Sequence, residues 1–167
     1  MIYEATAELL PIKGWLDIRG GEAVRKICDR ELCGELPTIV QTASEIKDVG
    51  VGFCVAPDHW MLCLVDGEDS RWEEKFQKAL SGEFCSITNV SDMYLTFRLE
   101  GKQARDVLLQ AVSADLHPRV FSKGSFLRTA FAKTTAMVYQ TSDEPAYDVT
   151  VYRSYKSYVG EWFSQII

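Results

Sequence analysis

The sequence has little of what metal and dinucleotide sites require. Its 167 residues include two histidines and five cysteines, and no two cysteines form a CxxC pair. Gly20-Gly21 lacks the third glycine that lets a helix pack closely against a bound dinucleotide. We therefore expect no metal site and no nucleotide site in this chain.

Basic residues are also in the minority. Lys and Arg number 18 against 24 Asp and Glu, which gives a net charge of −6 that repels a phosphate backbone. No stretch reaches the roughly 18 apolar residues of a membrane span, and the start, MIYEATAELLPIKG, lacks a basic region followed by an apolar run. These absences predict a cytoplasmic protein with no nucleic-acid and no membrane partner.

The remaining composition is that of an ordinary globular protein. The chain is 47% hydrophobic, 11% aromatic and 25% charged. A chain of this length can bury a substantial core, so we predict a single domain over residues 1–167. Most cysteines lie among apolar neighbours, as Cys54 and Cys63 do, and are predicted to be small core residues.

The order of elements in the first half follows from periodicity and turn residues. It predicts a strand over 12–19, a helix over 22–32, strands over 51–56 and 59–65, a helix capped by Ser70 and ended by Gly82, and a strand over 84–90. Residues 1–14 and 38–49 carry little period of either kind. No further element is predicted there.

The second half has a similar order of strands and helices. It predicts a strand over 94–100, a helix with its apolar stripe over 104–111, strands over 126–131, 135–139 and 147–151, and an amphipathic helix from Tyr155 to Ile166. The segment 112–123 contains Leu116, Val120 and Phe121. We expect it to pack on the body of the protein.

The two halves indicate an internal repeat over about 12–91 and 93–166. An offset of 81 places Gly20 on Gly101, Ala23 on Ala104, Ile27 on Leu108 and Pro37 on Pro118. The alternative is that any strand-glycine-helix-proline unit gives such a match. The predicted fold class is α+β, with two ferredoxin-like split-βαβ units in one layered body.

Several ordered motifs resemble the gamma subunit of heterotetrameric sarcosine oxidase. They are APDHWML at 56–62, VSD at 90–92, FRLEGKQARDVL at 97–108, DLHPRVF at 115–121 and PAYDVTVYRSY at 145–155. That family is in turn similar to the folate-binding aminomethyltransferase domain of the glycine cleavage system. The resemblance spans residues 15–163 and implies the folate-binding fold.

The resemblance also implies partners and cofactors. The complex of that family oxidatively demethylates sarcosine to glycine, with alpha, beta and delta subunits beside gamma. FAD, FMN, NAD, tetrahydrofolate and zinc belong to those other subunits, so none is expected in this chain. Aminomethyltransferases carry a pair of acids in a stretch that corresponds here to residues 133–138, where no carboxylate stands. We therefore expect no aminomethyl transfer and no catalytic residue here.

The candidate residues are thus binding or interface residues. His117 and Arg119 flank a rigid proline, from which a guanidinium can reach a carboxylate, although a plain solvated turn explains them too. Arg128, Tyr147 and Arg153 complete the set. The alternative function is a stand-alone folate or small-carboxylate binder that uses Arg119, Arg128 or Tyr147.

A hydrolase is a remote third option. Ser91, Asp92, Asp115 and His117 supply suitable side chains, but no strand-to-helix G-x-S-x-G turn accompanies them.

Overall fold

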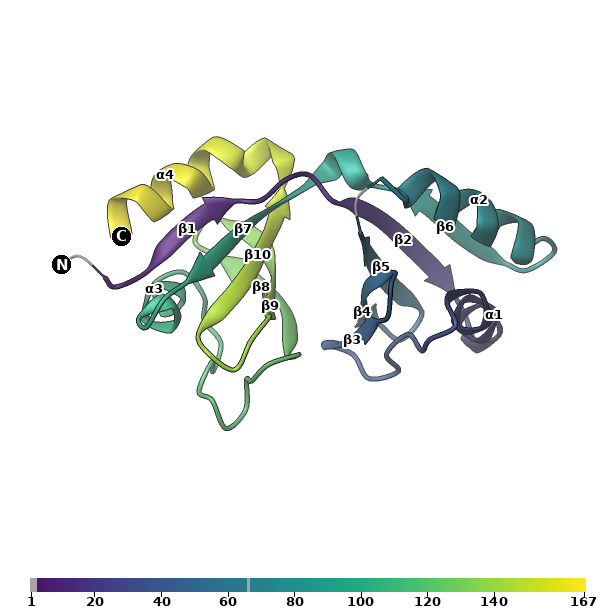
Figure 1. Ribbon diagram of the computed structural model, residues 1–167, viewed down its shortest axis with the longest axis horizontal. Coiled ribbons are helices and arrows are strands. Elements are labelled where there is room, and N and C mark those ends of the chain that lie inside the picture. Colours follow the sequence, from purple (N-terminus) through teal and green to yellow (C-terminus); the bar gives the residue numbers. More distant parts are fainter. Residues whose placement is uncertain (1–2, 66) are drawn as a thin grey trace. The chain divides into compact units, whose positions relative to one another are not determined.

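The computed structural model describes residues 3–65 and 67–167 and divides the chain into two compact units (Figure 1). Unit 1 consists of Met1–Pro11 and Asp92–Ile167, and unit 2 of Ile12–Ser91. The chain therefore starts in unit 1, builds all of unit 2 and then returns to unit 1.

Unit 2 is an antiparallel sheet with two helices. Its elements are β2 (Gly14–Gly20), α1 (Glu22–Leu32), β3 (Thr42–Ile46), β4 (Gly50–Ala56), β5 (His59–Leu64), α2 (Asp69–Ala79) and β6 (Cys85–Asn89). The strand order is β3-β4-β5-β2-β6. Without the edge strand β3, this is the βαββαβ order of a ferredoxin-like split-βαβ unit.

The core of unit 2 lies between its sheet and its helices. Leu16 and Ile18 of β2 are buried together with Val24 and Cys28 of α1 and Phe76 of α2. Apolar residues that alternate along β2 and recur every four positions along α1 meet in this layer. The sequence pattern thus determines which face of each element is buried.

Unit 1 has a sheet of the same strand order, and one of its edge strands comes from the N-terminal segment. Its elements are β1 (Thr6–Leu9), β7 (Tyr94–Glu100), α3 (Ala104–Leu109), β8 (Phe126–Phe131), β9 (Thr134–Gln140), β10 (Ala146–Tyr152) and α4 (Lys156–Ile166). Short 3-10 turns at Ser91–Met93 and Arg153–Tyr155 precede β7 and α4. The order β8-β9-β10-β7-β1 matches that of unit 2, with β1 in the place of β6.

A cluster of aromatic side chains packs α4 against the sheet in the core of unit 1. Phe163 of α4 lies 5.5 Å from Phe97 of β7 and 5.7 Å from Phe131 of β8, measured between ring centroids. Trp162 packs edge-on against Phe131 at 5.0 Å. Rings at these distances and tilts bury large areas and favour one arrangement of α4 on the sheet.

The α+β class with two split-βαβ units is confirmed, and most element bounds agree within two residues. Two stretches that the sequence left unassigned contain strands, and two local predictions are wrong. Thr6–Leu9 and Thr42–Ile46 are strands where none was predicted. The N-cap of α2 is Glu68 in place of Ser70, without a side-chain hydrogen bond. Val120 is 57% exposed and does not pack on the body, whereas Leu116 and Phe121 of the same segment are buried there as expected.

The internal repeat stays a prediction, as does the assignment of the whole chain to one domain. The equal strand orders support the repeat, and a glycine stands at each strand-to-helix corner, where Gly20 ends β2 and Gly101 directly follows β7. The helices, however, match with a shift of one residue. Val24 and Cys28 are buried as Ala104 and Leu108 are, whereas Ala23 is exposed.

In the part of the chain that the structure describes, no helix is long and apolar enough to cross a membrane.

The cysteines differ in burial. Cys28, Cys54 and Cys63 are buried as predicted, whereas Cys33 is exposed at the left-handed C-cap of α1. Burial raises the pKa of the Cys28 thiol to about 12, so that thiol stays protonated and unreactive at neutral pH.

Candidate functional site: side chains of unit 1

All five candidate residues lie in unit 1, in two separate groups. His117 and Arg119 belong to the segment between α3 and β8, in which Phe121 stacks on Tyr147 near the start of β10. Arg128 of β8 and Arg153 lie by the other end of β10, at Tyr152. Tyr147 and Tyr152 are five positions apart along β10, which corresponds to about 17 Å. The candidates therefore do not form one site.

The first group is a turn with a defined internal hydrogen-bond pattern. The backbone N–H of His117 donates to Asp115 Oδ1 at 2.9 Å, and that of Arg119 donates to His117 Nδ1 at 3.3 Å. The carbonyl oxygen of His117 accepts from the N–H groups of Val120 and Phe121, both at 2.9 Å. Side-chain bonds of this local kind hold a turn without a helix or sheet.

Tyr147 contacts Phe121, the buried residue that follows this turn. Its side chain is fully buried, and its ring stacks on Phe121 with centroids 6.4 Å apart. Burial raises the pKa of the Tyr147 hydroxyl, and the nearby Arg105 guanidinium opposes that rise only in part. Tyr147 thus remains a neutral phenol without exposed surface, and its contribution is to position Phe121.

The second group is a set of stacked and paired side chains. The rings of Tyr94 and Tyr152 stack at 5.1 Å, and Arg128 donates from Nη2 to Tyr152 Oη at 3.4 Å. Arg153 lies 3.5 Å from Asp92 in an exposed ion pair. Exposed pairs of this kind contribute little to stability because water and salt screen them. Both arginines are therefore already engaged within the unit.

The same sheet face carries a ladder of polar pairs. Thr96 and Thr150 share a hydrogen bond of 2.8 Å, and Arg98 donates to Asp148 on the neighbouring strand. The hydrogen bond from Arg98 to Asp148 raises the pKa of the guanidinium despite its partial burial. Cross-strand pairs at opposite positions stabilise the β7–β10 pairing and leave the face polar.

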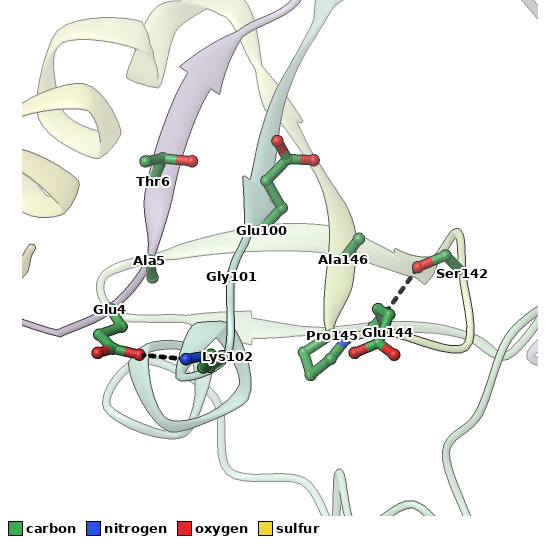
Figure 2. Close-up of a pocket in the computed structure, with 10 residues that line it drawn as sticks. All are labelled: Glu4, Ala5, Thr6, Glu100, Gly101, Lys102, Ser142, Glu144, Pro145 and Ala146. Carbon is green, nitrogen blue, oxygen red and sulfur yellow. Dashed lines mark hydrogen bonds and ion pairs between the residues drawn. The ribbon is translucent and has the colours of Figure 1, made fainter.

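A recess of about 480 Å³ lies at the end of this sheet, where β1 enters and β10 begins (Figure 2). Its walls are Glu4, Ala5, Thr6, Glu100, Gly101, Lys102, Ser142, Glu144, Pro145 and Ala146. Figure 2 shows Glu4 and Lys102, which form a 3.4 Å ion pair, on one side and Ser142 and Glu144 on the other.

Sequence reasoning did not find this recess. Its acids Glu4, Glu100 and Glu144 come from three distant parts of the chain, and only the sheet register brings them together. Gly101 closes it tightly, because a Cβ at that position would lie 2.5 Å from the carbonyl oxygen of Glu4. The recess could accept a cationic group, and its charges are largely solvated.

The stretch that corresponds to the acid pair of aminomethyltransferases lies in β9. Thr134–Gln140 contains no carboxylate, and Ala136, Met137 and Val138 are buried. Alanine, methionine and valine cannot exchange a proton with a substrate. Among residues 3–65 and 67–167, no group of three or more His, Cys, Asp or Glu side chains could hold a metal ion.

Comparison with curated proteins finds no match. Among solved structures, the chain is similar to heterotetrameric sarcosine oxidase from Corynebacterium sp. U-96 in complex with pyrrole 2-carboxylate. The TM-score is 0.88 at 20% identity, over 95% of this chain and 81% of that chain. At this identity the likeness shows a shared fold.

The chain is also similar to glycine cleavage system aminomethyltransferase T from Bartonella henselae. The TM-score is 0.70 at 14% identity, and the match covers 97% of this chain and 46% of that one. The predicted likeness to the aminomethyltransferase fold is confirmed. This chain corresponds to less than half the length of that enzyme.

The comparison with protein families agrees with the motifs at 56–62, 97–108, 115–121 and 145–155. It matches residues 21–166, which is most of the chain and includes the larger part of each unit and every candidate residue. The chain belongs to the sarcosine oxidase gamma subunit family.

Proposed function

We propose that this chain is a non-catalytic accessory subunit of a sarcosine oxidase-like heterotetramer. The family match over residues 21–166 carries this proposal. The similarity in fold to a chain of a heterotetrameric sarcosine oxidase supports it. The partners are subunits of the alpha, beta and delta type, in a complex that oxidatively demethylates sarcosine to glycine. The predicted cytoplasmic location belongs to the same proposal.

The chemistry of β9 supports an accessory part in that complex. Its buried positions Ala136, Met137 and Val138 offer no acid or base. In this proposal FAD, FMN, NAD, tetrahydrofolate and zinc are held by the other subunits. This subunit provides a folded α+β body with a surface that binds the other subunits.

Coexpression tests the proposal directly. A tagged version of this chain is produced with the candidate alpha, beta and delta subunits, and the eluate is analysed by size exclusion and by flavin absorbance. A coloured assembly that contains this chain in stoichiometric amount is the expected result. Folded, coloured partners that elute without this chain would overturn the proposal.

Thermal shift with folates tests the alternative of a stand-alone binder. A ligand at 100 times its Kd stabilises a protein by about 2.7 kcal/mol, a shift that is easily measured. Arg119 and Arg128 belong to separate groups and Tyr147 is buried, so the structure gives this alternative no shared pocket from those three residues. We expect no shift with this chain alone.

A further inference from the structure

The turn at residues 117–120 is exposed in a way that local packing does not explain. Four successive residues, His117, Pro118, Arg119 and Val120, are all exposed, although the residues on both sides are buried. Leu116 is 1% exposed and Phe121 is 5% exposed. A loop that only connected α3 to β8 would not need to project between two buried anchors.

The turn is rigid. The His117 carbonyl oxygen holds two N–H groups, and Pro118 has a fixed φ. Further along, the N–H of Gly124 donates to the carbonyl oxygen of Gln140, and the N–H of Gln140 donates to that of Ser125, at 2.9 and 3.0 Å. In Figure 1 the segment is the green loop below the sheet of unit 1. A rigid element loses little conformational entropy when it binds.

The exposed side chains have the chemistry of a docking element. No ion pair or hydrogen bond engages the Arg119 guanidinium within residues 3–65 and 67–167, in contrast to Arg128 and Arg153. Guanidinium groups bind carboxylates through two parallel hydrogen bonds, and arginine is enriched where proteins meet. Val120, 57% exposed beside it, adds apolar area to the same contact.

Charge indicates the nature of the partner. The chain carries a net charge of −6, which disfavours approach by an acidic surface at most places. Arg119 and Lys123 are exposed in the same segment, and these two cations outnumber its one acid, Asp115, so the segment is locally positive. An acidic surface can therefore approach the chain favourably here, and long-range repulsion elsewhere would help to select this orientation.

We propose that the 117–120 turn is the docking element through which this subunit binds an acidic patch on a partner subunit. Arg119 pairs there with a carboxylate side chain, and Val120 covers the apolar edge of that contact. The inference rests on the proposed function, because it requires a partner subunit. It adds the surface, the residue and the chemistry of the contact.

The test measures the Kd between the full-length chain and its folded partner subunits at two salt concentrations. Arg119→Glu is expected to raise the Kd about tenfold or more, as the loss of a central arginine does at other interfaces. Arg119→Lys keeps the positive charge but lacks the planar guanidinium, so its Kd should lie between those of the unaltered chain and of Arg119→Glu. The Arg119→Glu protein should also lose much of the salt dependence of binding.

Arg71→Glu is the matched control, since its side chain is 78% exposed on α2 and its reversal changes the net charge equally. Equal thermal midpoints for both variants would show that folding is intact. If the unaltered chain binds its partners and Arg119→Glu binds as well as Arg71→Glu, the docking turn is refuted and the accessory function stands. If the unaltered chain does not bind folded partners, both are refuted.

Discussion

The two units share a strand order but obtain their fourth ferredoxin-like strand differently. In unit 2 that strand is β6, which directly follows α2 in the chain. In unit 1 it is β1, which precedes the whole of unit 2 and pairs with β7 from Thr6 to Leu9. Unit 2 can thus close with local sequence, whereas unit 1 requires two segments about 80 residues apart.

The difference affects how each unit is held together. β6 is tied to α2 by polar side chains, because Asn89 and Ser91 both donate to Asp69. β1 instead relies on its ladder with β7 and on partly buried Ala5 and Ala7, which pack on the core of unit 1. Closing a long loop costs entropy that a contiguous strand avoids. Unit 1 should therefore depend more strongly on its fourth strand.

The largest expected effect is that of removing this strand. A chain that starts at Ile12 should lose about 3 kcal/mol or more of unfolding free energy, because ladder hydrogen bonds and apolar burial are lost together. Hydrogen exchange followed by mass spectrometry should show faster exchange mainly over 92–167. The control Thr6→Ala, at an exposed position of β1, should change little. Equal loss of protection in both units would contradict the comparison.

The same comparison explains which elements the sequence predicted. Tyr94–Glu100 alternates apolar and polar residues and has partners on both sides, so both bounds were predicted correctly. β1 and β3 are edge strands of four and five residues, and most of their side chains are exposed or half-buried. Such strands leave little period in the sequence. Their place is determined by the neighbour that they pair with.

The candidate site divides in the same way. The sequence identified Arg119 beside a rigid proline, because that feature lies within a few consecutive residues. It could not show that Tyr147 is buried beneath the turn, or that Arg128 pairs with Tyr152, since both follow from strand register. The recess of Figure 2 depends on three distant segments and was missed for that reason.

Substitutions of the glycines at the two strand-to-helix corners, Gly101 in unit 1 and Gly20 in unit 2, are expected to have effects of intermediate size. Gly101 has φ +126°, and a Cβ there would meet the backbone of β1's leading segment, 2.5 Å from the Glu4 oxygen. At Gly20 the nearest atoms belong to the Val24 side chain, at 2.6 Å. Backbone cannot yield as a side chain can. Gly101→Ala should therefore cost about 2–3 kcal/mol and Gly20→Ala about 1–2 kcal/mol, measured by urea unfolding.

If Gly20→Ala cost more than Gly101→Ala, the backbone at Glu4 and Ala5 that leads into β1 would adjust more easily than the Val24 side chain of α1. The double variant provides the control for independence. Because the two positions lie in different units, the costs should add within about 0.5 kcal/mol if the sites do not interact.

The smallest expected effect concerns the polar link between α2 and β6. Hydrogen bonds from Asn89 and Ser91, at 2.8 and 2.9 Å, hold the pKa of Asp69 below its ordinary 3.8. A lowered folded-state pKa gives stability that is present above about pH 4 and is lost as pH falls through the folded value. Asp69→Asn keeps the size and an acceptor oxygen but cannot ionise. It should cost about 1 kcal/mol at pH 7.

The decisive observation is how that cost changes with pH. The two proteins should converge in stability as the pH falls below 3.8 and through the lowered folded-state pKa of Asp69, because the carboxyl then becomes protonated in the unaltered chain as well. Asn89→Ala removes one donor and leaves the carboxylate, so it should reduce the pH dependence without abolishing it. If the cost of Asp69→Asn stays constant from pH 7 to pH 3, the charge of Asp69 does not contribute to the link between α2 and β6. The two units would then not differ in the electrostatic way described here.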